Sequence, residues 1–367
     1  MIKTSESVLK GHPDKICDGI ADSILTKLIE KDPNTRTGIE CLIKDDLLVI
    51  AGEITTTADI DYSEVAKEYL EEVGLDSDEF NILEKISVQS GDIALGVDTG
   101  GAGDQGIMYG YATNETEEFM PLPIVLSRKL AVGLDELNKK APLFFAKDGK
   151  CQVSVKYQND KPVELTAVVV SVQTRPAILR VSYEPYIHKV IFNTLPKELI
   201  THDTIILVNP TGEFVKGGSY ADSGLTGRKL QCDSYGGLAL HGGGAWSGKD
   251  LTKVDRSASY YARYIAKNIV ASGLAKKCEI GIAYAIGIER PVSVSINTFG
   301  TGIISEDSLL STIHEVFDFR PQEITKQIGV TNFRQLAAYG QVGVLTDTLP
   351  WEQLNKVEAI QKLGNDD

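Results

Sequence analysis

Apolar and polar positions along the chain follow an order that repeats three times. In the first unit Ile16, Ile20 and Ile24 recur at every fourth position, which is the spacing of an amphipathic helix. Two apolar-rich segments then flank the polar turn Asp45–Asp46, which predicts a strand hairpin. The first unit therefore contains a helix over 16–30, strands over 38–44 and 47–55, and a helix over 63–73.

The same order of helix, hairpin and helix returns twice. Helices alternating with paired strands are typical of an α+β layer, with a sheet on one side and helices on the other. We therefore expect an α+β fold with three similar domains related by pseudo-threefold symmetry, each a mixed sheet with helices on one face. The alternative is that so common a motif recurs by accident. The second unit has helices over 124–137 and 183–192 and strands over 151–157 and 163–172, and the third has helices over 257–274 and 306–317 and strands over 278–285 and 292–298.

The length of 367 residues exceeds what one hydrophobic core usually serves. We divide the chain into an N-terminal domain (1–99), a central domain (100–215) and a C-terminal domain (216–367), and segments may be exchanged between them. The five cysteines are scattered singly without a CxxC pair, which favours a reducing compartment over a disulfide frame or a zinc site. The sequence shows neither a signal peptide nor an apolar run long enough for a bilayer. We expect a cytoplasmic protein with no membrane partner.

The net charge of −14 argues against binding to nucleic acid, which requires basic surface to neutralise phosphates. The window from Glu213 to Arg256 is different, because its six basic and five acidic residues give it +1 and leave −15 for the rest of the chain. A local relief of negative charge suits a small anionic ligand, above all one that arrives with metal ions.

Four glycine- and charge-rich segments stand apart from this scaffold, and the first is GHPDK, residues 11–15. Pro13 suits the first turn of a helix, where free backbone amides form an anion site. His12 could donate to a developing oxyanion, and Asp14 could bind a hard cation. Asp14, Asp18 and Asp22 also share one helical face, and taken alone that pattern is better explained as a solvated acidic face.

The second and third segments supply further carboxylates. Glu53, in GEITT, and Glu40 come from neighbouring strands and could hold an ammonium group or a monovalent cation, or could be exposed edge charges. The third segment, GVDTGGAGDQG over 96–106, has the glycine density of a mobile lid or a close-approach loop. Three aspartates in and before it are possible oxygen ligands of Mg²⁺, namely Asp92, Asp98 and Asp104.

The fourth segment holds 11 of the 34 glycines between Gly212 and Gly248. Within it, Gly243 to Lys249 reads GxxxxGK, the spacing of a phosphate-binding Walker A loop. The next residue is Asp250 rather than Ser or Thr, and no clear apolar strand precedes the loop, so the Walker interpretation fails. Glycine amides, a lysine and a following helix N-terminus still form a phosphate cradle. Asp255 has a sufficient structural role as the N-cap of that helix.

Taken together, the motifs GHPDK, GEITT, GAGDQG, DSGLTGRK and GGGAWSGKDxxKVDRS resemble the S-adenosylmethionine synthetase (methionine adenosyltransferase) family of bacterial type. The resemblance runs essentially from end to end. It implies three similar α+β domains and a homodimer with shared active sites, assembled as a dimer of dimers. It also implies that the methionine sulfur attacks C5′ of ATP and displaces triphosphate, which is hydrolysed to pyrophosphate and phosphate, with two Mg²⁺ per site and K⁺ assisting.

The resemblance also assigns roles by motif. The implied catalytic residues are His12, Lys249, Arg228 and Lys150, and the implied metal ligands are Asp14 and Asp255 for Mg²⁺ and Glu40 for K⁺. Methionine would contact Glu53, Gln89, Asp222 and Lys253, with residues 89–99 as the gating loop. ATP would contact His12, Asp148, Lys150, Glu213, Phe214, Asp222, Arg228, Lys229, Ala245 and Lys249, with Phe214 stacked on adenine.

Several positions depart from the family pattern. The loop between Val97 and Gly103 is short for a bacterial member, Glu213 stands where arginine is usual, and Ser219 replaces a usual proline. Two other functions remain possible interpretations of the sequence. A kinase or another ATP-dependent transferase would release ADP or AMP, and a non-catalytic regulatory subunit would have lost the charged site residues that this chain retains.

Overall fold

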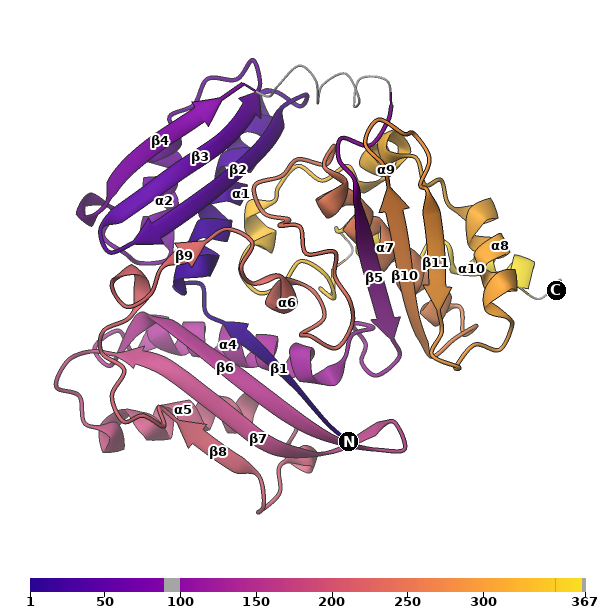
Figure 1. The fold of residues 1–367 in the computed structure, drawn as a ribbon. Coiled ribbons are helices and arrows are strands. Elements are labelled where there is room, and N and C mark those ends of the chain that lie inside the picture. The colour runs from indigo at the N-terminus through magenta and orange to yellow at the C-terminus, as the bar shows by residue number, and fades with distance from the viewer. Residues whose placement is uncertain (89–99, 347, 365–367) are drawn as a thin grey trace.

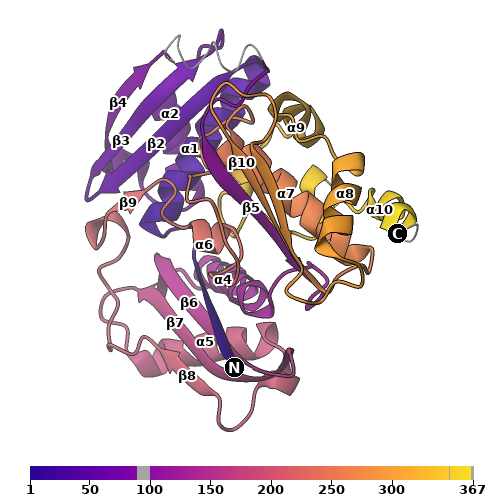
Figure 2. The same ribbon diagram turned by 45° about the vertical axis from the view of Figure 1, so that its right-hand side comes forward.

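The computed structural model describes residues 1–88, 100–346 and 348–364. It consists of three sheets, each with its helices packed on one face, arranged around a common centre (Figures 1 and 2). The α+β prediction is confirmed. The repeating pattern also located the antiparallel strand pair in each sheet, β2–β3, β6–β7 and β10–β11, and helices that cover them.

The first sheet has the strand order β4-β3-β2-β9. Alternation along β2 sends Ile39, Cys41 and Ile43 into a core with α1 and α2, while Glu40 faces outward. The predicted hairpin is present, with Asp45 at positive φ in its turn. The elements are α1 (Pro13–Lys31), β2 (Arg36–Lys44), β3 (Leu47–Thr55), α2 (Tyr62–Glu72), β4 (Asn81–Ser87) and β9 (Gly224–Leu225).

The second sheet has the order β1-β6-β7-β8. Inward-facing valines of β6 and β7, such as Val153 and Val170, pack with Leu130 and Ile187 from the two helices. Its elements are β1 (Ile2–Val8), α4 (Leu122–Lys140), β6 (Phe145–Gln158), β7 (Lys161–Thr174), α5 (Arg180–Thr194) and β8 (Ile205–Val208).

The third sheet has the order β11-β10-β5 and packs on a central, almost fully buried helix, α7. Gly110 allows β5 to contact α7 closely, because a Cβ atom there would overlap the backbone at Ala262. Its elements are β5 (Gly106–Thr113), α7 (Val254–Ala271), β10 (Lys277–Tyr284), β11 (Ser293–Asn297), α8 (Glu306–Val316), α9 (Pro321–Ile328) and α10 (Val357–Gly364).

Each sheet takes one edge strand from a different part of the chain. β1 joins the second sheet beside β6, β5 joins the third beside β10, and β9 joins the first beside β2. The exchange is therefore cyclic, as the three-fold arrangement in Figure 1 shows. The division at residues 99 and 215 remains a prediction, but the exchange shows that no sheet is built from a single continuous segment.

The faces of the sheets turned away from the helices carry exposed apolar residues. Leu83 on β4 is 50% exposed, Val88 just after it is 75% exposed, and Ile107 on β5 is 50% exposed. An apolar side chain on an uncovered sheet face is a common feature of association surfaces. These faces adjoin the candidate site described next.

Candidate active site

The start of α1 places His12 as predicted, at the entrance of the helix. His12 is the N-cap, Pro13 follows at the first helical position, and the ring Nδ1 accepts a 3.2 Å hydrogen bond from the Asp14 backbone N–H. Burial, together with the positive charge of Lys229, lowers the His12 pKa to about 4. The imidazole is therefore neutral at pH 7, and because Nδ1 is the acceptor, Nε2 carries the proton and can donate it.

Asp14, Asp18 and Asp22 are not a solvated face, so that interpretation was wrong. Their exposed fractions are 1%, 0% and 0%. Each carboxylate instead accepts a backbone N–H of the glycine-rich segment. The three bonds are Leu225 N to Asp14 at 3.0 Å, Gly227 N to Asp18 at 2.8 Å and Gly248 N to Asp22 at 2.9 Å. The helix spacing that aligns the carboxylates thus also fixes the path of the glycine-rich segment.

A cationic cluster surrounds Asp14. The Lys229 ammonium forms an ion pair with its Oδ2, and the Arg228 Nε lies 3.6 Å from its Oδ1. Lys150, on β6, and Asp222 are close enough to His12 to influence its pKa in opposite directions. His12, Asp14, Lys150, Asp222, Arg228 and Lys229 are thereby brought together, and we refer to them as the His12 cluster.

The loop over 214–218 is fastened next to this cluster. Asp148 Oδ2 accepts from Gly218 N at 2.9 Å, and Gln173 Nε2 donates to the Val215 carbonyl at 2.9 Å. The Phe214 carbonyl accepts from Thr174 N at 2.8 Å, so the backbone that carries this partly buried ring is attached to the end of β7. Glu213 is exposed at the side of the loop. The predicted adenine contacts therefore lie beside the His12 cluster.

A second group lines a cavity of about 370 Å³ at the outer face of the first sheet. Lys249 Nζ is 2.7 Å from Asp255 Oδ2, and Lys253 Nζ is 3.2 Å from Asp250 Oδ2. The predicted site residues that line the cavity are Glu40, Glu53, Asp104, Ala245, Lys249, Lys253 and Asp255, and we refer to them as the Lys249 cluster.

Asp255 is not the N-cap of α7, which corrects the sequence interpretation. The N-cap is Lys253, and it makes no side-chain capping bond. Asp255 lies in the first turn with a half-buried carboxylate directed at Lys249. Because the helix does not use this carboxylate as a cap, it remains available to the cavity.

Glu40 and Glu53 lie on the same open face of the first sheet. Glu53 on β3 pairs with Gly38 on β2, and Glu40 follows two residues after Gly38 on β2. Both side chains are exposed in the cavity wall. Gln89, Asp92 and Asp98 lie outside the residues that the structure describes, as does the gating loop predicted over 89–99.

The two clusters meet β2 at different points along one edge. Leu225, near the His12 cluster, pairs with Leu42, whereas Lys249 forms a bridge with Gly38. Four residues of an extended strand separate these points by roughly 13 Å, at about 3.3 Å per residue. The two clusters on one chain are thus neighbouring but distinct groups.

The carboxylates of the site are too few to hold Mg²⁺ alone, but they fit an ion that takes most of its ligands from phosphate oxygens. In residues 1–88, 100–346 and 348–364 no three Asp, Glu, His or Cys side chains form a metal-binding group. Mg²⁺ is commonly held by one or two carboxylates together with substrate phosphates and water. Asp14 and Asp255 each offer one carboxylate, already facing a lysine that a phosphate oxygen can engage instead.

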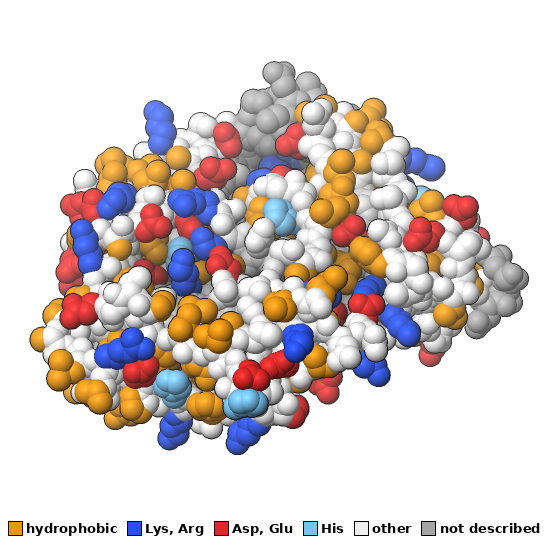
Figure 3. Space-filling model, turned by 60° about the horizontal axis from the view of Figure 1, so that its bottom comes forward, with side chains coloured by type: hydrophobic (Ala, Val, Ile, Leu, Met, Phe, Trp, Pro, Cys, Tyr) orange, Lys and Arg blue, Asp and Glu red, His pale blue; other side chains and the backbone are white. Residues whose placement is uncertain are grey.

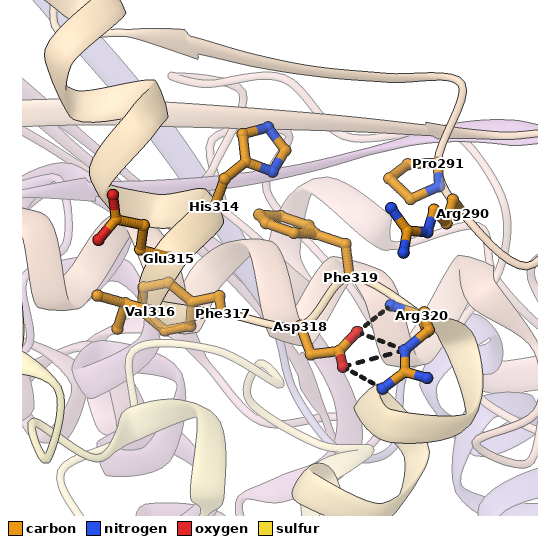
Figure 4. Close-up of a pocket in the computed structure, with 9 residues that line it drawn as sticks. All are labelled: Arg290, Pro291, His314, Glu315, Val316, Phe317, Asp318, Phe319 and Arg320. Carbon is orange, nitrogen blue, oxygen red and sulfur yellow. Dashed lines mark hydrogen bonds and ion pairs between the residues drawn. The ribbon is translucent and has the colours of Figure 1, made fainter.

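Another cavity lies between the β10–β11 turn and the end of α8 (Figure 4). Its volume is about 650 Å³, and its described lining contains no predicted site residue. Arg320 is held by Asp318 through hydrogen bonds from Nε to both carboxylate oxygens at 3.0 Å. The charges of this cavity are balanced internally, which does not favour an ATP site.

Sequence reasoning missed the residues that hold the Lys249 turn. These are buried side chains to which no role in the site was assigned, and of them only Arg256 lies in one of the quoted motifs: Thr37, Asp22, Arg256, Tyr260 and Gln341. The signal that could have found one of them was the helical spacing of the carboxylates on α1, which was interpreted as solvent exposure.

Comparison with known proteins identifies the family of the chain through three successive matched segments. Family models of the S-adenosylmethionine synthetase N-terminal, central and C-terminal domains match residues 1–91, 99–214 and 216–353. The chain belongs to the S-adenosylmethionine synthetase family. Its curated relatives include S-adenosylmethionine synthases of Clostridium acetobutylicum (47% identical), Clostridium tetani (46%) and Desulforudis audaxviator (47%), each aligned over 98% of both chains.

This family membership makes the chain an enzyme, a methionine adenosyltransferase. Among the described residues no helix is both long and apolar enough to cross a bilayer. The relatives match the chain nearly end to end, so both clusters lie within the matched region.

Proposed function

We propose that this chain makes S-adenosylmethionine from ATP and L-methionine, with triphosphate as the leaving group. The sulfur lone pair forms the bond to C5′ while the C5′–O5′ bond breaks and its electron pair passes to the triphosphate. Water then cleaves the triphosphate to pyrophosphate and phosphate. The observation that carries this proposal is the gathering of five cationic side chains in two clusters beside β2 of an otherwise acidic protein: Lys150, Arg228, Lys229, Lys249 and Lys253.

His12 is proposed to stabilise the leaving oxygen. Negative charge develops on O5′ as the bond breaks, and a donor aimed at that atom is worth more in the transition state than in the ground state. The neutral His12 ring, with its proton on Nε2, provides such a donor at pH 7. A protonated imidazole is not required, because the neighbouring lysines supply the positive charge.

The phosphates are proposed to contact Lys150, Arg228, Lys229 and Lys249, with Lys249 and Arg228 also serving hydrolysis of triphosphate. Arg228 and Lys229 face Asp14, and Lys249 faces Asp255, so a polyphosphate enters a region already organised for charge pairing. Adenosine is proposed to contact Asp148, Glu213, Phe214, Asp222 and Ala245, with Phe214 stacked on the base.

Methionine is proposed to occupy the cavity of the Lys249 cluster. Its ammonium group would bind the carboxylate of Glu53, and its carboxylate would face Lys253. Asp222, which lies in the His12 cluster, would contact methionine where a second copy brings the two clusters together. Gln89 is proposed as a further contact. The volume of about 370 Å³ and the mixture of acidic and basic wall residues suit an amino acid zwitterion.

Two Mg²⁺ ions per site are proposed, held by Asp14 and Asp255, together with K⁺ at Glu40. When bound, these ions neutralise the charge that builds up on the departing triphosphate. The residues of the chain orient the phosphates around them. Glu40 is exposed on the open face of the sheet, where a monovalent cation can exchange.

A homodimer with shared active sites, assembled as a dimer of dimers, is proposed from two observations. The His12 and Lys249 clusters are separated along β2, and the neighbouring sheet faces carry exposed apolar residues such as Leu83 and Ile107. A second copy packed on these faces can complete each site. We also propose the domains 1–99, 100–215 and 216–367, with their edge strands exchanged.

The chain is proposed to act in the cytoplasm without nucleic acid or membrane partners. All five cysteines are unpaired and buried, which suits a reducing compartment. On the face shown in Figure 3, acidic and basic side chains are intermixed rather than gathered in a basic stripe. That distribution does not favour a polyanion.

The proposed function is tested by incubating the protein with ATP, methionine, Mg²⁺ and K⁺. Formation of S-adenosylmethionine, pyrophosphate and phosphate in equal amounts is expected. Release of ADP or AMP without a sulfonium product would instead indicate a kinase or another ATP-dependent transferase. Absence of every product over a range of cation concentrations would refute the proposal.

A further inference from the structure

The main chain on both sides of Lys249 is held by one buried ion pair. Asp22 Oδ1 accepts from Gly248 N at 2.9 Å, immediately before Lys249. Arg256 Nη1 donates to the Lys249 carbonyl at 3.1 Å. The two side chains hold each other through Nη1–Oδ1 at 2.7 Å and Nη2–Oδ2 at 2.8 Å, a bidentate pair.

This ion pair is fully buried and joins two domains. Asp22 and Arg256 are both 0% exposed, and they come from α1 and α7. Removing two charges from water costs free energy that the attraction within the pair does not necessarily return. Asp22 and Arg256 bind each other through two parallel hydrogen bonds and also bind the backbone at residues 248 and 249. The pair therefore has a role in positioning this turn, in addition to any effect on stability.

A further set of bonds locks the orientation of the arginine. Tyr260 accepts from Arg256 Nε at 2.9 Å and bonds to Gln341, whose Oε1 also accepts from Arg256 Nη2 at 3.2 Å. Gln341 in turn donates to Ser247 Oγ at 3.0 Å. The guanidinium therefore has little freedom to rotate, and Ser247, two residues before Lys249, is tied to the same network.

The other side of the turn is attached to β2. The Gly248 carbonyl accepts from Ile39 N at 3.1 Å and from Thr37 Oγ1 at 2.9 Å. Gly248 itself has φ +80°, and a Cβ atom there would overlap the Ile39 carbonyl. Residue 248 is thus fixed from both faces, and the direction in which Lys249 leaves the backbone follows from this arrangement.

We propose that the Asp22–Arg256 ion pair positions Lys249, so that its ammonium group meets the polyphosphate of the nucleotide in one fixed place. This inference rests on the proposed function, because it assigns Lys249 to the polyphosphate. Lysine has a long flexible stem, so a fixed backbone removes part of the disorder that would otherwise oppose phosphate binding. Asp22 and Arg256 are positioning residues, since neither contacts the cavity.

The helix α7 provides a matched control for this test. Arg263 is also fully buried and bonded to a carboxylate, Glu352, and to backbone carbonyls, but it has no contact with the Lys249 turn. Replacing either arginine by lysine shortens a buried cation and removes its fork. A loss of stability alone should therefore affect Arg256→Lys and Arg263→Lys alike, whereas a positioning role should distinguish them.

The experiment measures binding of tripolyphosphate with Mg²⁺ by calorimetry, at a temperature where each variant is folded. Lys249→Ala is the reference for complete loss of this contact. We expect Arg256→Lys to weaken tripolyphosphate binding at least tenfold, close to the effect of Lys249→Ala, and Arg263→Lys to remain within twofold of the unmodified protein. In the double variant Arg256→Lys, Lys249→Ala the two effects should not add.

If Arg256→Lys does not fold, two less disruptive variants test the same proposal. Tyr260→Phe removes only the hydroxyl that fixes Arg256, and Tyr264→Phe, one turn further along α7, removes a hydroxyl bonded to Asn355. We expect a threefold or greater loss of tripolyphosphate affinity for the first and none for the second. Equal affinities for these two variants would overturn the proposal, as would unchanged binding in Lys249→Ala.

Steady-state kinetics give a second test, because a purely structural role of Arg256 would not lower kcat selectively. We expect Arg256→Lys to lower kcat at least tenfold while the KM for methionine stays within threefold. Failure of the unmodified protein to form S-adenosylmethionine would refute the proposed function. The tripolyphosphate comparison would still decide whether Arg256 positions Lys249, because it requires binding alone.

Discussion

Asp18 Oδ1 accepts a 2.8 Å hydrogen bond from the backbone N–H of Gly227, a residue 209 positions later in the chain. Its other oxygen is 3.1 Å from the Lys15 ammonium, and both side chains are fully buried. Burial raises the pKa of Asp18 to about 7, against the opposing effect of Lys15. The segment that carries Arg228 and Lys229, which are proposed to bind phosphate, is therefore fixed from inside the protein rather than supported from its surface.

Replacing Lys249 by alanine should affect turnover far more than methionine binding. Its ammonium group is assigned to charge that develops on the phosphates, and loss of one such group typically lowers kcat about 100- to 1,000-fold. The KM for methionine should change by no more than about threefold. Steady-state kinetics would measure both, with Lys161→Ala, an exposed lysine at the β6–β7 turn, as the control. Unchanged turnover in Lys249→Ala would place the phosphates elsewhere.

His12 should make the fold less stable as the pH falls below about 6.5. Its folded-state pKa is lowered to about 4, so between these values the unfolded chain binds a proton that the native protein does not. The loss reaches on the order of 3 kcal/mol once the pH has fallen through that interval. Urea titrations from pH 7 to pH 4 would measure it.

His12→Gln keeps a neutral polar side chain and is the control for this effect. The free energy of unfolding of His12→Gln should depend less steeply on pH between 6.5 and 4 than that of the unmodified protein. Identical slopes for the two proteins would show that His12 titrates normally in the folded state.

Gly248→Ala should destabilise the protein by about 3 kcal/mol or more. The residue has φ +80°, and an added methyl group would overlap the Ile39 carbonyl, so strain and a clash act together. Gly243 has φ +86° but nothing within 4 Å of an added Cβ, and Gly243→Ala should cost only about 1 kcal/mol. Urea unfolding of the two variants compares them directly, and similar losses would contradict the close contact at Gly248.

Glu352→Gln should be among the more damaging single substitutions outside the site. Glu352 neutralises Arg263 at 3.0 Å and Lys267 at 2.8 Å, and all three are buried. Removing one partner from a buried charge group typically costs about 3–5 kcal/mol, because the remaining charges lose their compensation. Chemical denaturation would measure this.

Glu72→Gln is the surface counterpart of that change. Glu72 pairs with Arg334, but its side chain is 42% exposed. Water can replace the lost partner, so the expected cost is less than about 1 kcal/mol. Equal losses for Glu352→Gln and Glu72→Gln would argue against the burial of the Arg263 group.

Local pattern was sufficient to predict the hairpin in each sheet. In the hairpins apolar residues alternate with polar ones, and in the covering helices they recur every three to four residues. β2 shows the alternation through its buried Ile39, Cys41 and Ile43. Of the strands at the sheet edges, β11 was predicted as part of its hairpin, whereas the others were not, namely β1, β4, β5, β8 and β9. β9 has only two residues, and β1 pairs with β6 about 150 positions away, so neither strand is specified by its own neighbours in the sequence.

The residues of the site were found largely through motifs, and the misses have a physical reason. Motifs reveal side chains that face a ligand, such as His12 and Lys249, because their surroundings are rich in glycine and charge. Asp22 looks like any acidic residue on a helix until the structure shows Gly248 and Arg256 against it. Burial of a charge depends on what packs over it, and that information is spread over the whole chain.

The cyclic exchange of β1, β5 and β9 has a consequence for synthesis of the protein. The edge of β2 that β9 covers cannot be completed before residue 224 has left the ribosome, although β2 itself ends at residue 44. An open strand edge can pair with the wrong neighbour for as long as it is exposed. At roughly 5–20 residues per second, that interval lasts on the order of ten seconds or more. Nascent chains of this protein should therefore depend on chaperones that shield strand edges.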